Sequence, residues 1–124
     1  MIYDTKRILI IDDDEDFRSY VYDLLTSRGF EVFSAANGKE GVDTINKEKI
    51  DIILVDMIMP EREGVETIME VRLTHPDIKI IAMSGAIRHD TYLRLAGELG
   101  ADITMSKPFK KEEMLNAINV VCKV

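Results

Sequence analysis

The chain has 124 residues, which is enough for one domain with its own hydrophobic core. Its formal net charge of -7 argues against direct binding to nucleic acid, because phosphates require a clustered basic surface. No apolar run approaches the roughly 20 residues that cross a bilayer, and the first residues lack a signal-peptide pattern. We therefore expect a single domain, residues 1–124, in the cytoplasm and without membrane contact.

Short apolar segments rich in β-branched residues recur along the chain, each bounded by polar residues, and predict buried strands. A further, weaker segment near the C-terminus is inferred as a strand mainly from its place in the alternation. The expected strands are Ile8–Ile11, Glu31–Ala35, Ile52–Val55, Ile78–Met83 and Asp102–Met105.

The segments between these strands have apolar residues at helical spacing. Phe17, Tyr20, Val21, Leu24 and Leu25 are expected to form one helix face, and Val65, Ile68, Met69 and Arg72 another. Shorter helices are predicted around Val42, Leu95 and Ile118. Strands that alternate with helices predict an α/β fold, a doubly wound parallel sheet with helices on both faces.

Reactive side chains stand at the carboxyl ends of the expected strands, where such sheets bind ligands. Asp12 and Asp13 follow the first strand, Asp56 the third and Ser84 the fourth, and Lys107 comes just after the fifth. Carboxylates that converge in one cleft repel one another, and a hard cation such as Mg²⁺ relieves this cost. Asp14, Glu15 and Asp16 are instead expected at a helix N-terminus.

These residue types together predict phosphoryl-transfer chemistry. Asp56 is the candidate nucleophile, because Asp12 and Asp13 are adjacent and better placed as metal ligands. Lys107 and Ser84 can stabilise charge on phosphoryl oxygens, one as a cation and the other as a hydrogen-bond donor. The Lys107–Pro108 bond is a candidate for the cis form, which would turn the ammonium into the cleft.

Four segments, in order and spacing, resemble the response-regulator receiver domain of two-component systems; they are IIDDDEDFR, DIILVDMIMPEREG, IIAMSGA and GADITMSKPF. The resemblance implies a flavodoxin-like fold with strand order 2-1-3-4-5. It also implies a phosphoacceptor at Asp56, and metal ligation by Asp12, Asp13, Asp56 and the backbone carbonyl of Ile58. Pro60, Gly64 and Pro108 would support the loops.

The resemblance further implies Mg²⁺, with Mn²⁺ as an alternative, and a sensor histidine kinase or phosphotransfer protein as phosphodonor. The protein would be a signalling domain rather than a conventional enzyme. It would act on an effector through its fourth helix, fifth strand and fifth helix. Phosphorylation could also lead to a homodimer. Thr104 departs from the family, which often has an aromatic residue there. The positions that in the family tune phosphoaspartate hydrolysis are Ile58 and Ala86 here, which are neither acidic nor amide-bearing.

Two other functions compete with this interpretation. Asp12-Asp13-Asp14 after an apolar strand also resembles the start of haloacid-dehalogenase-type phosphatases, in which Asp12 would be the nucleophile. In that family, however, the later acidic motif follows the hydroxyl and lysine motifs, whereas Asp56 precedes both Ser84 and Lys107 here. The second competitor is a pseudo-receiver that docks partners without phosphorylation, which phosphate retention after acetyl phosphate treatment would distinguish.

Overall fold

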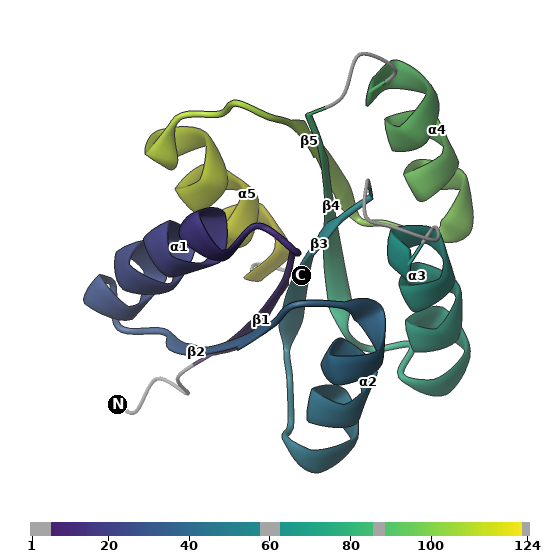
Figure 1. Ribbon diagram of the computed structural model, residues 1–124, viewed down its shortest axis with the longest axis horizontal. Helices are drawn as coiled ribbons and strands as arrows, with labels where there is room; N and C mark the ends of the chain where they lie inside the picture. Colours follow the sequence, from purple (N-terminus) through teal and green to yellow (C-terminus); the bar gives the residue numbers. More distant parts are fainter. Residues whose placement is uncertain (1–5, 58–62, 86–88, 123–124) are drawn as a thin grey trace.

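Five parallel strands form a central sheet, and a helix follows each strand (Figure 1). The computed structural model describes residues 6–57, 63–85 and 89–122. The strands are β1 (Arg7–Ile11), β2 (Glu31–Ala35), β3 (Ile52–Asp56), β4 (Lys79–Ser84) and β5 (Ile103–Ser106). The helices are α1 (Glu15–Ser27), α2 (Gly38–Lys47), α3 (Glu63–Thr74), α4 (His89–Leu99) and α5 (Lys111–Cys122). The strand order β2-β1-β3-β4-β5 confirms the predicted doubly wound α/β sheet.

The sheet has a hydrophobic core on each face, because helices cover both sides. Alternate residues of β1 show this: Leu9 and Ile11 pack in the core beneath α2, α3 and α4, and Ile8 and Ile10 pack in the core beneath α1 and α5. All four side chains are fully buried. A strand covered on both faces needs apolar residues at every position, which explains the unbroken apolar runs in the sequence.

Side-chain caps fix where the first two helices begin. The Asp14 carboxylate accepts a hydrogen bond from the Phe17 amide at 3.1 Å and so caps α1. In α2, the Asn37 side chain accepts from the Glu40 amide at 2.9 Å, and the Glu40 carboxylate accepts from the Ala36 amide at 3.0 Å. These caps satisfy N–H groups that have no partner within the helix. The α1 cap also sets the path of the chain just after Asp12 and Asp13.

The last two strands lie one residue further along the chain than predicted. Ile78 belongs to a turn, since its amide donates to the His75 carbonyl at 3.2 Å. Asp102 precedes β5, and its carboxylate accepts from the Ile80 amide at 2.8 Å. At the other end, Ser84 pairs with Ser106 and is part of β4. The serine hydroxyl therefore projects from the sheet itself rather than from the loop that follows it.

Two residues assigned to buried helix faces are exposed. Tyr20 of α1 has 53% of its surface accessible, and Met69 of α3 has 49%. The stripe of α1 that contacts the sheet is narrow and runs along Val21 and Leu25, which are one turn apart and fully buried. Tyr20 lies beside this stripe. In α3 the equivalent buried residues are Ile68 and Val71, and Met69 faces outward.

Arg72 joins the end of α3 to the edge of the sheet opposite the strand carboxyl ends. Its guanidinium donates to the carbonyls of Ile78 at 2.7 Å, Gly100 at 2.8 Å and Pro76 at 3.1 Å. The same guanidinium lies 2.6 Å from the Asp102 carboxylate. One side chain thus ties together α3, the start of β4 and the connection from α4 to β5. We call this set the Arg72 clamp.

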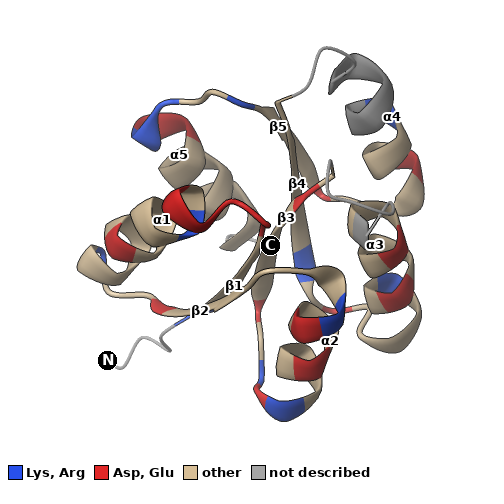
Figure 2. Ribbon diagram, in the orientation of Figure 1, with Lys and Arg blue, Asp and Glu red and all other residues tan. Residues whose placement is uncertain are grey.

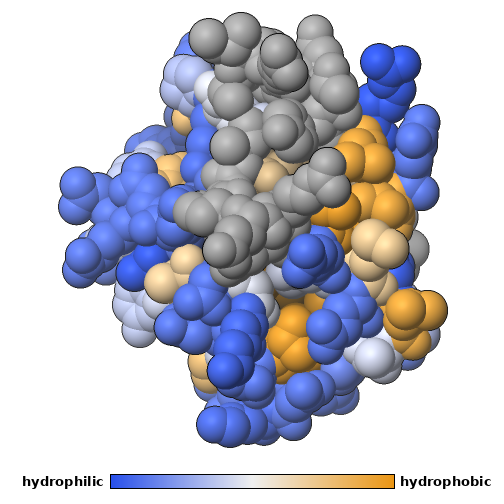
Figure 3. Space-filling view, turned by 45° about the vertical axis from the view of Figure 1, so that its right-hand side comes forward, coloured by the Kyte–Doolittle hydropathy of each residue, from blue (hydrophilic) through white to orange (hydrophobic). Residues whose placement is uncertain are grey.

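The surface beyond these elements is mixed in character. Figure 3 shows the side of the molecule on which α2, α3 and α4 lie, where apolar surface occurs as separate patches among hydrophilic residues. Leu73 of α3 is 83% exposed.

Cys122 is half-buried against the core beneath α1 and α5, and this burial raises the pKa of its thiol. Among the helices that the structure describes, none has the length and apolar character of a membrane-spanning segment.

Candidate functional site

Acidic side chains from two strands meet at the carboxyl edge of the sheet. Asp12 and Asp13 stand directly after β1, and Asp56 is the last residue of β3. Figure 2 shows acidic residues along the segment that joins β1 to α1. One carboxylate oxygen from each of Asp12, Asp13 and Asp56 lies within 4.8 Å of the others. The structure therefore brings together the three acidic residues expected to hold a metal.

The three carboxylates differ in exposure. Asp12 is fully buried and Asp56 is 6% exposed, whereas Asp13 is exposed. Close carboxylates in a partly buried cleft repel one another, and a divalent cation with oxygen ligands offsets this repulsion. Carboxylate oxygens are also the ligands that Mg²⁺ prefers. The residues present therefore fit a hard divalent cation, with Asp13 on the solvent side.

Asp12 is held firmly by its neighbours. Its Oδ1 accepts a hydrogen bond from the Asp14 amide at 2.9 Å, and its Oδ2 lies 2.6 Å from the Lys107 ammonium. Its backbone carbonyl accepts from the Arg18 guanidinium at 2.7 Å. Both carboxylate oxygens thus have partners, and the orientation of the side chain is fixed from two directions.

Lys107 brings the positive charge of the site. Its ammonium lies 2.6 Å from Asp12 Oδ2 and 3.6 Å from Asp56 Oδ2. The Lys107 backbone amide donates to the Ser84 carbonyl at 2.8 Å, which fixes the lysine against the end of β4. The Lys107–Pro108 peptide bond is cis, as expected. The ammonium therefore bridges the metal-ligand candidate and the phosphoacceptor candidate.

Ser84 has a buried hydroxyl that lacks a hydrogen-bond partner. The residue is fully buried, and within residues 6–57, 63–85 and 89–122 its Oγ is the one buried side-chain polar atom with no partner. Leaving a hydroxyl buried and unpaired costs about 1–3 kcal/mol. Unpaired buried groups are uncommon in folded proteins and call for an explanation, which a ligand at this site would supply.

The supporting residues fall in different places. Gly64 lies in the first turn of α3, where a Cβ atom would meet the backbone of Asp56 and Met57. Pro108 is exposed beside the cleft, and Thr104 is exposed on β5. Ile58, Pro60 and Ala86 lie outside the residues that the structure describes.

An aromatic hollow borders the site, and sequence reasoning assigned no role to it. Its volume is about 470 Å³, and its lining residues are Phe17, Tyr20, Gly85, Lys107, Pro108 and Phe109. Phe17 lies about one helical turn after Asp12 and Asp13 in the sequence, and Phe109 directly follows Pro108. The signal available in the sequence was the position of these rings next to residues already assigned to the site.

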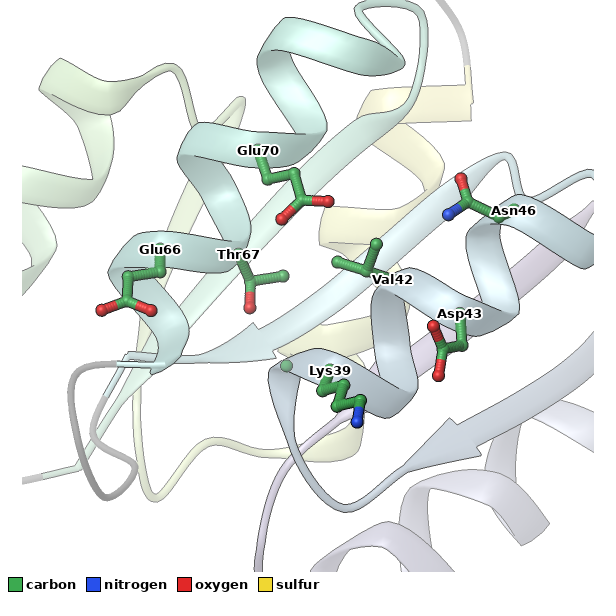
Figure 4. A pocket seen from close by; sticks show the side chains of 8 residues that line it. Lys39, Val42, Asp43, Asn46, Glu66, Thr67 and Glu70 are labelled. Atoms are coloured by element: carbon green, nitrogen blue, oxygen red, sulfur yellow. The ribbon is translucent and has the colours of Figure 1, made fainter.

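A second hollow, of about 490 Å³, lies between α2 and α3, away from the acidic cluster (Figure 4). Its lining includes Asp43, Glu66 and Glu70, with one basic residue, Lys39. None of the residues predicted for phosphoryl chemistry lines it. The reactive groups and the α2–α3 hollow are therefore separate features.

The sequence matches the response regulator receiver domain family over residues 8–119. The chain belongs to this family. Receiver domains are the signalling domains of two-component systems, and the predicted family and fold are both confirmed.

Curated relatives include short and long proteins. The chain is 36% identical over 119 residues to the chemotaxis protein CheY of Thermotoga maritima, covering 95% of the chain and 98% of that protein. It is 31% identical to sporulation initiation phosphotransferase F of Bacillus subtilis, covering 91% of the chain and 90% of that protein. The transcriptional regulatory protein CpxR of Escherichia coli is 33% identical over 95% of the chain, which spans only 50% of CpxR.

Solved structures agree with this assignment. A CheY-like receiver domain from Methanospirillum hungatei has a TM-score of 0.87 at 30% identity, over 94% of this chain and 92% of that chain. A receiver domain from Clostridium thermocellum has a TM-score of 0.85 at 30% identity, over 94% of this chain and 93% of that chain. The arrangement of strands and helices is therefore that of known receiver domains.

Proposed function

We propose that this receiver domain accepts a phosphoryl group on Asp56 from a phosphohistidine of a sensor histidine kinase or phosphotransfer protein. An oxygen of the Asp56 carboxylate attacks phosphorus, and the phosphorus–nitrogen bond breaks as the phosphorus–oxygen bond forms. The imidazole nitrogen retains the bonding electron pair and takes a proton from solvent. The product is an aspartyl phosphate, so the chain changes its own state rather than turning over a free substrate.

The buried Ser84 hydroxyl is the observation that carries this proposal. A metal site alone would need the carboxylates, but it would not need an unpaired donor at the end of the neighbouring strand. A phosphoryl group on Asp56 has equatorial oxygens that require donors and positive charge. Ser84 can supply the donor and Lys107 the charge, since its ammonium is 3.6 Å from Asp56 Oδ2.

The acidic residues have a separate task in the proposed reaction. Asp12, Asp13 and Asp56, with the Ile58 carbonyl implied by the family, would hold Mg²⁺ or Mn²⁺. When bound, the cation neutralises charge on the phosphoryl oxygens and lowers the barrier to their approach to a carboxylate. The Asp14 amide already orients the Asp12 carboxylate at the site.

The contacts of the Asp12 carboxylate disfavour the phosphatase alternative. Both of its carboxylate oxygens are engaged, one by a backbone amide and the other by Lys107. A carboxylate held in this way is a poor nucleophile, because attack would require it to give up two charge-stabilising contacts. The motif order, with Asp56 before Ser84 and Lys107, also differs from that of the phosphatases.

We further propose that the chain works as a single cytoplasmic domain that passes its state to an effector domain or protein through the α4-β5-α5 surface. Phosphorylation would draw the Ser84 hydroxyl toward the phosphoryl group, and β4 and β5 are paired at Ser84 and Ser106. Thr104 is exposed on β5 and has no ring, so the change would be carried by the backbone. A homodimer formed on phosphorylation could use the same surface, and DNA binding would belong to a partner.

Intact-mass spectrometry with Mg²⁺ and acetyl phosphate tests the proposed chemistry. Wild type is expected to gain the mass of one phosphoryl group, and Asp56→Asn to gain none although it remains folded, since the amide keeps the shape and loses the nucleophile. Asp12→Asn is the matched control at a neighbouring carboxylate and should retain some labelling. Wild-type labelling of the Asp56 variant would move the nucleophile to Asp12, and an unlabelled wild type would favour the pseudo-receiver.

A further inference from the structure

The lysine of the site rests on the face of an aromatic ring. The Lys107 ammonium lies 4.0 Å from the centroid of Phe17, in the first turn of α1. The Phe17 ring meets Phe109 edge-on, with centroids 5.9 Å apart and an interplanar angle of 81°. Phe109 follows Pro108 in the connection from β5 to α5. The two rings therefore join the start of α1 to the segment that carries the lysine.

The ring contact differs in kind from the other contacts of Lys107. Asp12 and Asp56 attract the ammonium as anions, and this attraction changes when a cation binds to the carboxylates or when Asp56 accepts a phosphoryl group. The Phe17 ring attracts the ammonium through its quadrupole, which neither event removes. Without the ring, the flexible four-carbon side chain of Lys107 would let the ammonium leave the cleft when a carboxylate binds the cation instead.

Space around the lysine stem is also restricted. A Cβ atom on Gly85 would lie 2.9 Å from Lys107 Cβ, so the stem passes close to the end of β4. Phe17 bounds the other end of the side chain, at the ammonium. Lys107 is thus confined by backbone at its base and by an aromatic face at its tip.

We propose that Phe17 is a positioning residue for Lys107. It keeps the ammonium within reach of the Asp56 oxygens while the carboxylate charges change, and its contact with Phe109 holds the β5–α5 connection in register with α1. The proposal deepens the proposed function, because it assigns to this ring the readiness of Lys107 for an incoming phosphoryl group. Phe17 itself does not touch the reacting atoms.

Packing alone is the simpler explanation of the same ring, since Phe17 is half-buried against the core beneath α1 and α5. Substitutions separate the two explanations. Phe17→Leu keeps an apolar side chain and removes the aromatic face, whereas Phe17→Tyr keeps the face. Tyr20→Leu is the matched control, because Tyr20 is an aromatic residue of the same helix that lines the same hollow.

Two measurements test the proposal. The first is the NMR shift of the Lys107 ε-methylene protons, which a ring face moves upfield; the upfield shift should be lost in Phe17→Leu and retained in Phe17→Tyr and Tyr20→Leu. The second is the rate of Asp56 labelling as a function of acetyl phosphate concentration. Phe17→Leu should lower the limiting rate about fivefold, with Mg²⁺ affinity unchanged.

A wild-type labelling rate in folded Phe17→Leu would overturn the proposal, as would equal loss of rate in Phe17→Leu and Phe17→Tyr. If Phe17→Leu does not fold, Phe17→Met provides the same comparison with a side chain of greater length. Failure of the proposed function has a different signature, namely wild type that takes no phosphoryl group. In that event the methylene shift still decides whether the ring holds the ammonium.

Discussion

Gly64 supports the phosphoacceptor by having no side chain. A Cβ atom at this position would lie 2.7 Å from the Cα of Met57 and would also meet the carbonyl oxygen of Asp56. Real Cβ atoms do not approach backbone this closely, and backbone cannot rotate away as a flexible side chain can. The first turn of α3 therefore packs directly on the end of β3, which fixes the residue that carries the proposed nucleophile.

Gly64→Ala should destabilise the protein by about 1–3 kcal/mol, because the strand end or the helix must shift. Labelling of Asp56 should slow as well, since that shift displaces the carboxylate. Thermal unfolding and intact-mass kinetics measure the two effects. Gly97→Ala in α4 is the control: among the described residues, no atom outside the backbone of its own helix lies within 4 Å of the added Cβ, so the helix should gain up to about 1 kcal/mol. Equal stability of the two variants would contradict the close packing.

At single positions the sequence predicted which residues could react but not how they are paired. Asp12, Asp56, Ser84 and Lys107 were recognisable because parallel strands end at one edge of a sheet. The Lys107–Asp12 contact joins residues 95 positions apart and depends on how two loops fold over that edge. Phe17 was assigned to a helix face, where its spacing fits, although its ring also meets the ammonium.

The Arg72 clamp works at the scale of whole elements. The Arg72 guanidinium donates hydrogen bonds to three backbone carbonyls and pairs with one carboxylate, and the Arg72 side chain is 22% exposed. Without it, the carbonyls of Ile78 and Gly100 would lose a charged donor at the ends of two elements. A group of this shape suits the task because its donors form a planar fork.

Arg72→Met should therefore destabilise the protein by about 2 kcal/mol, since the apolar stem is kept and the charged hydrogen bonds are lost. Urea denaturation measures the change, and Arg94→Met on the exposed surface of α4 is the matched control. The two variants lose the same charge, so a difference between them reports the clamp. A clamp variant as stable as the control would show that water replaces the guanidinium without cost.

The elements themselves were largely predictable, because a strand buried on both faces has an unmistakable apolar run. β1 and β3 were found within one residue of their observed bounds. The one-residue shift of β4 and β5 relative to the prediction reflects long-range contacts. Asp102 lies just before β5, and its carboxylate accepts a hydrogen bond from the Ile80 amide of β4. Arg72 was placed on the packed face of its helix, but its partners near Gly100 could not be read from local spacing.

At the scale of the whole molecule, folding concentrates negative charge at the carboxyl edge of the sheet. The net charge is -7, and three carboxylates converge where Lys107 contributes the nearby ammonium. A ligand that binds only the folded state stabilises that state, and the stabilisation grows with the logarithm of the ligand concentration. A divalent cation at this edge would thus act on the stability of the entire chain.

Mg²⁺ at ten times its dissociation constant should stabilise the folded state by about 1.4 kcal/mol and raise Tm by about 5 °C. The rise should disappear after chelation. In Asp13→Asn,Asp56→Asn the Mg²⁺-dependent rise should be lost, because two of the three carboxylate ligands are gone. Calorimetry with and without Mg²⁺ measures this, and an equal rise in the double variant would place the metal elsewhere.

The Arg72 clamp also holds the C-terminal end of α4 through the Gly100 carbonyl. Gly100 follows the last residue of α4 and is held by the guanidinium, whereas the helix begins at His89, a few residues beyond Ser84. A rigid helix that is held at one end undergoes its largest displacement at the other end. A displacement at the end of β4 would therefore be expected to shift the N-terminal end of α4 more than its C-terminal end, and a partner bound at the N-terminal end would experience the larger change.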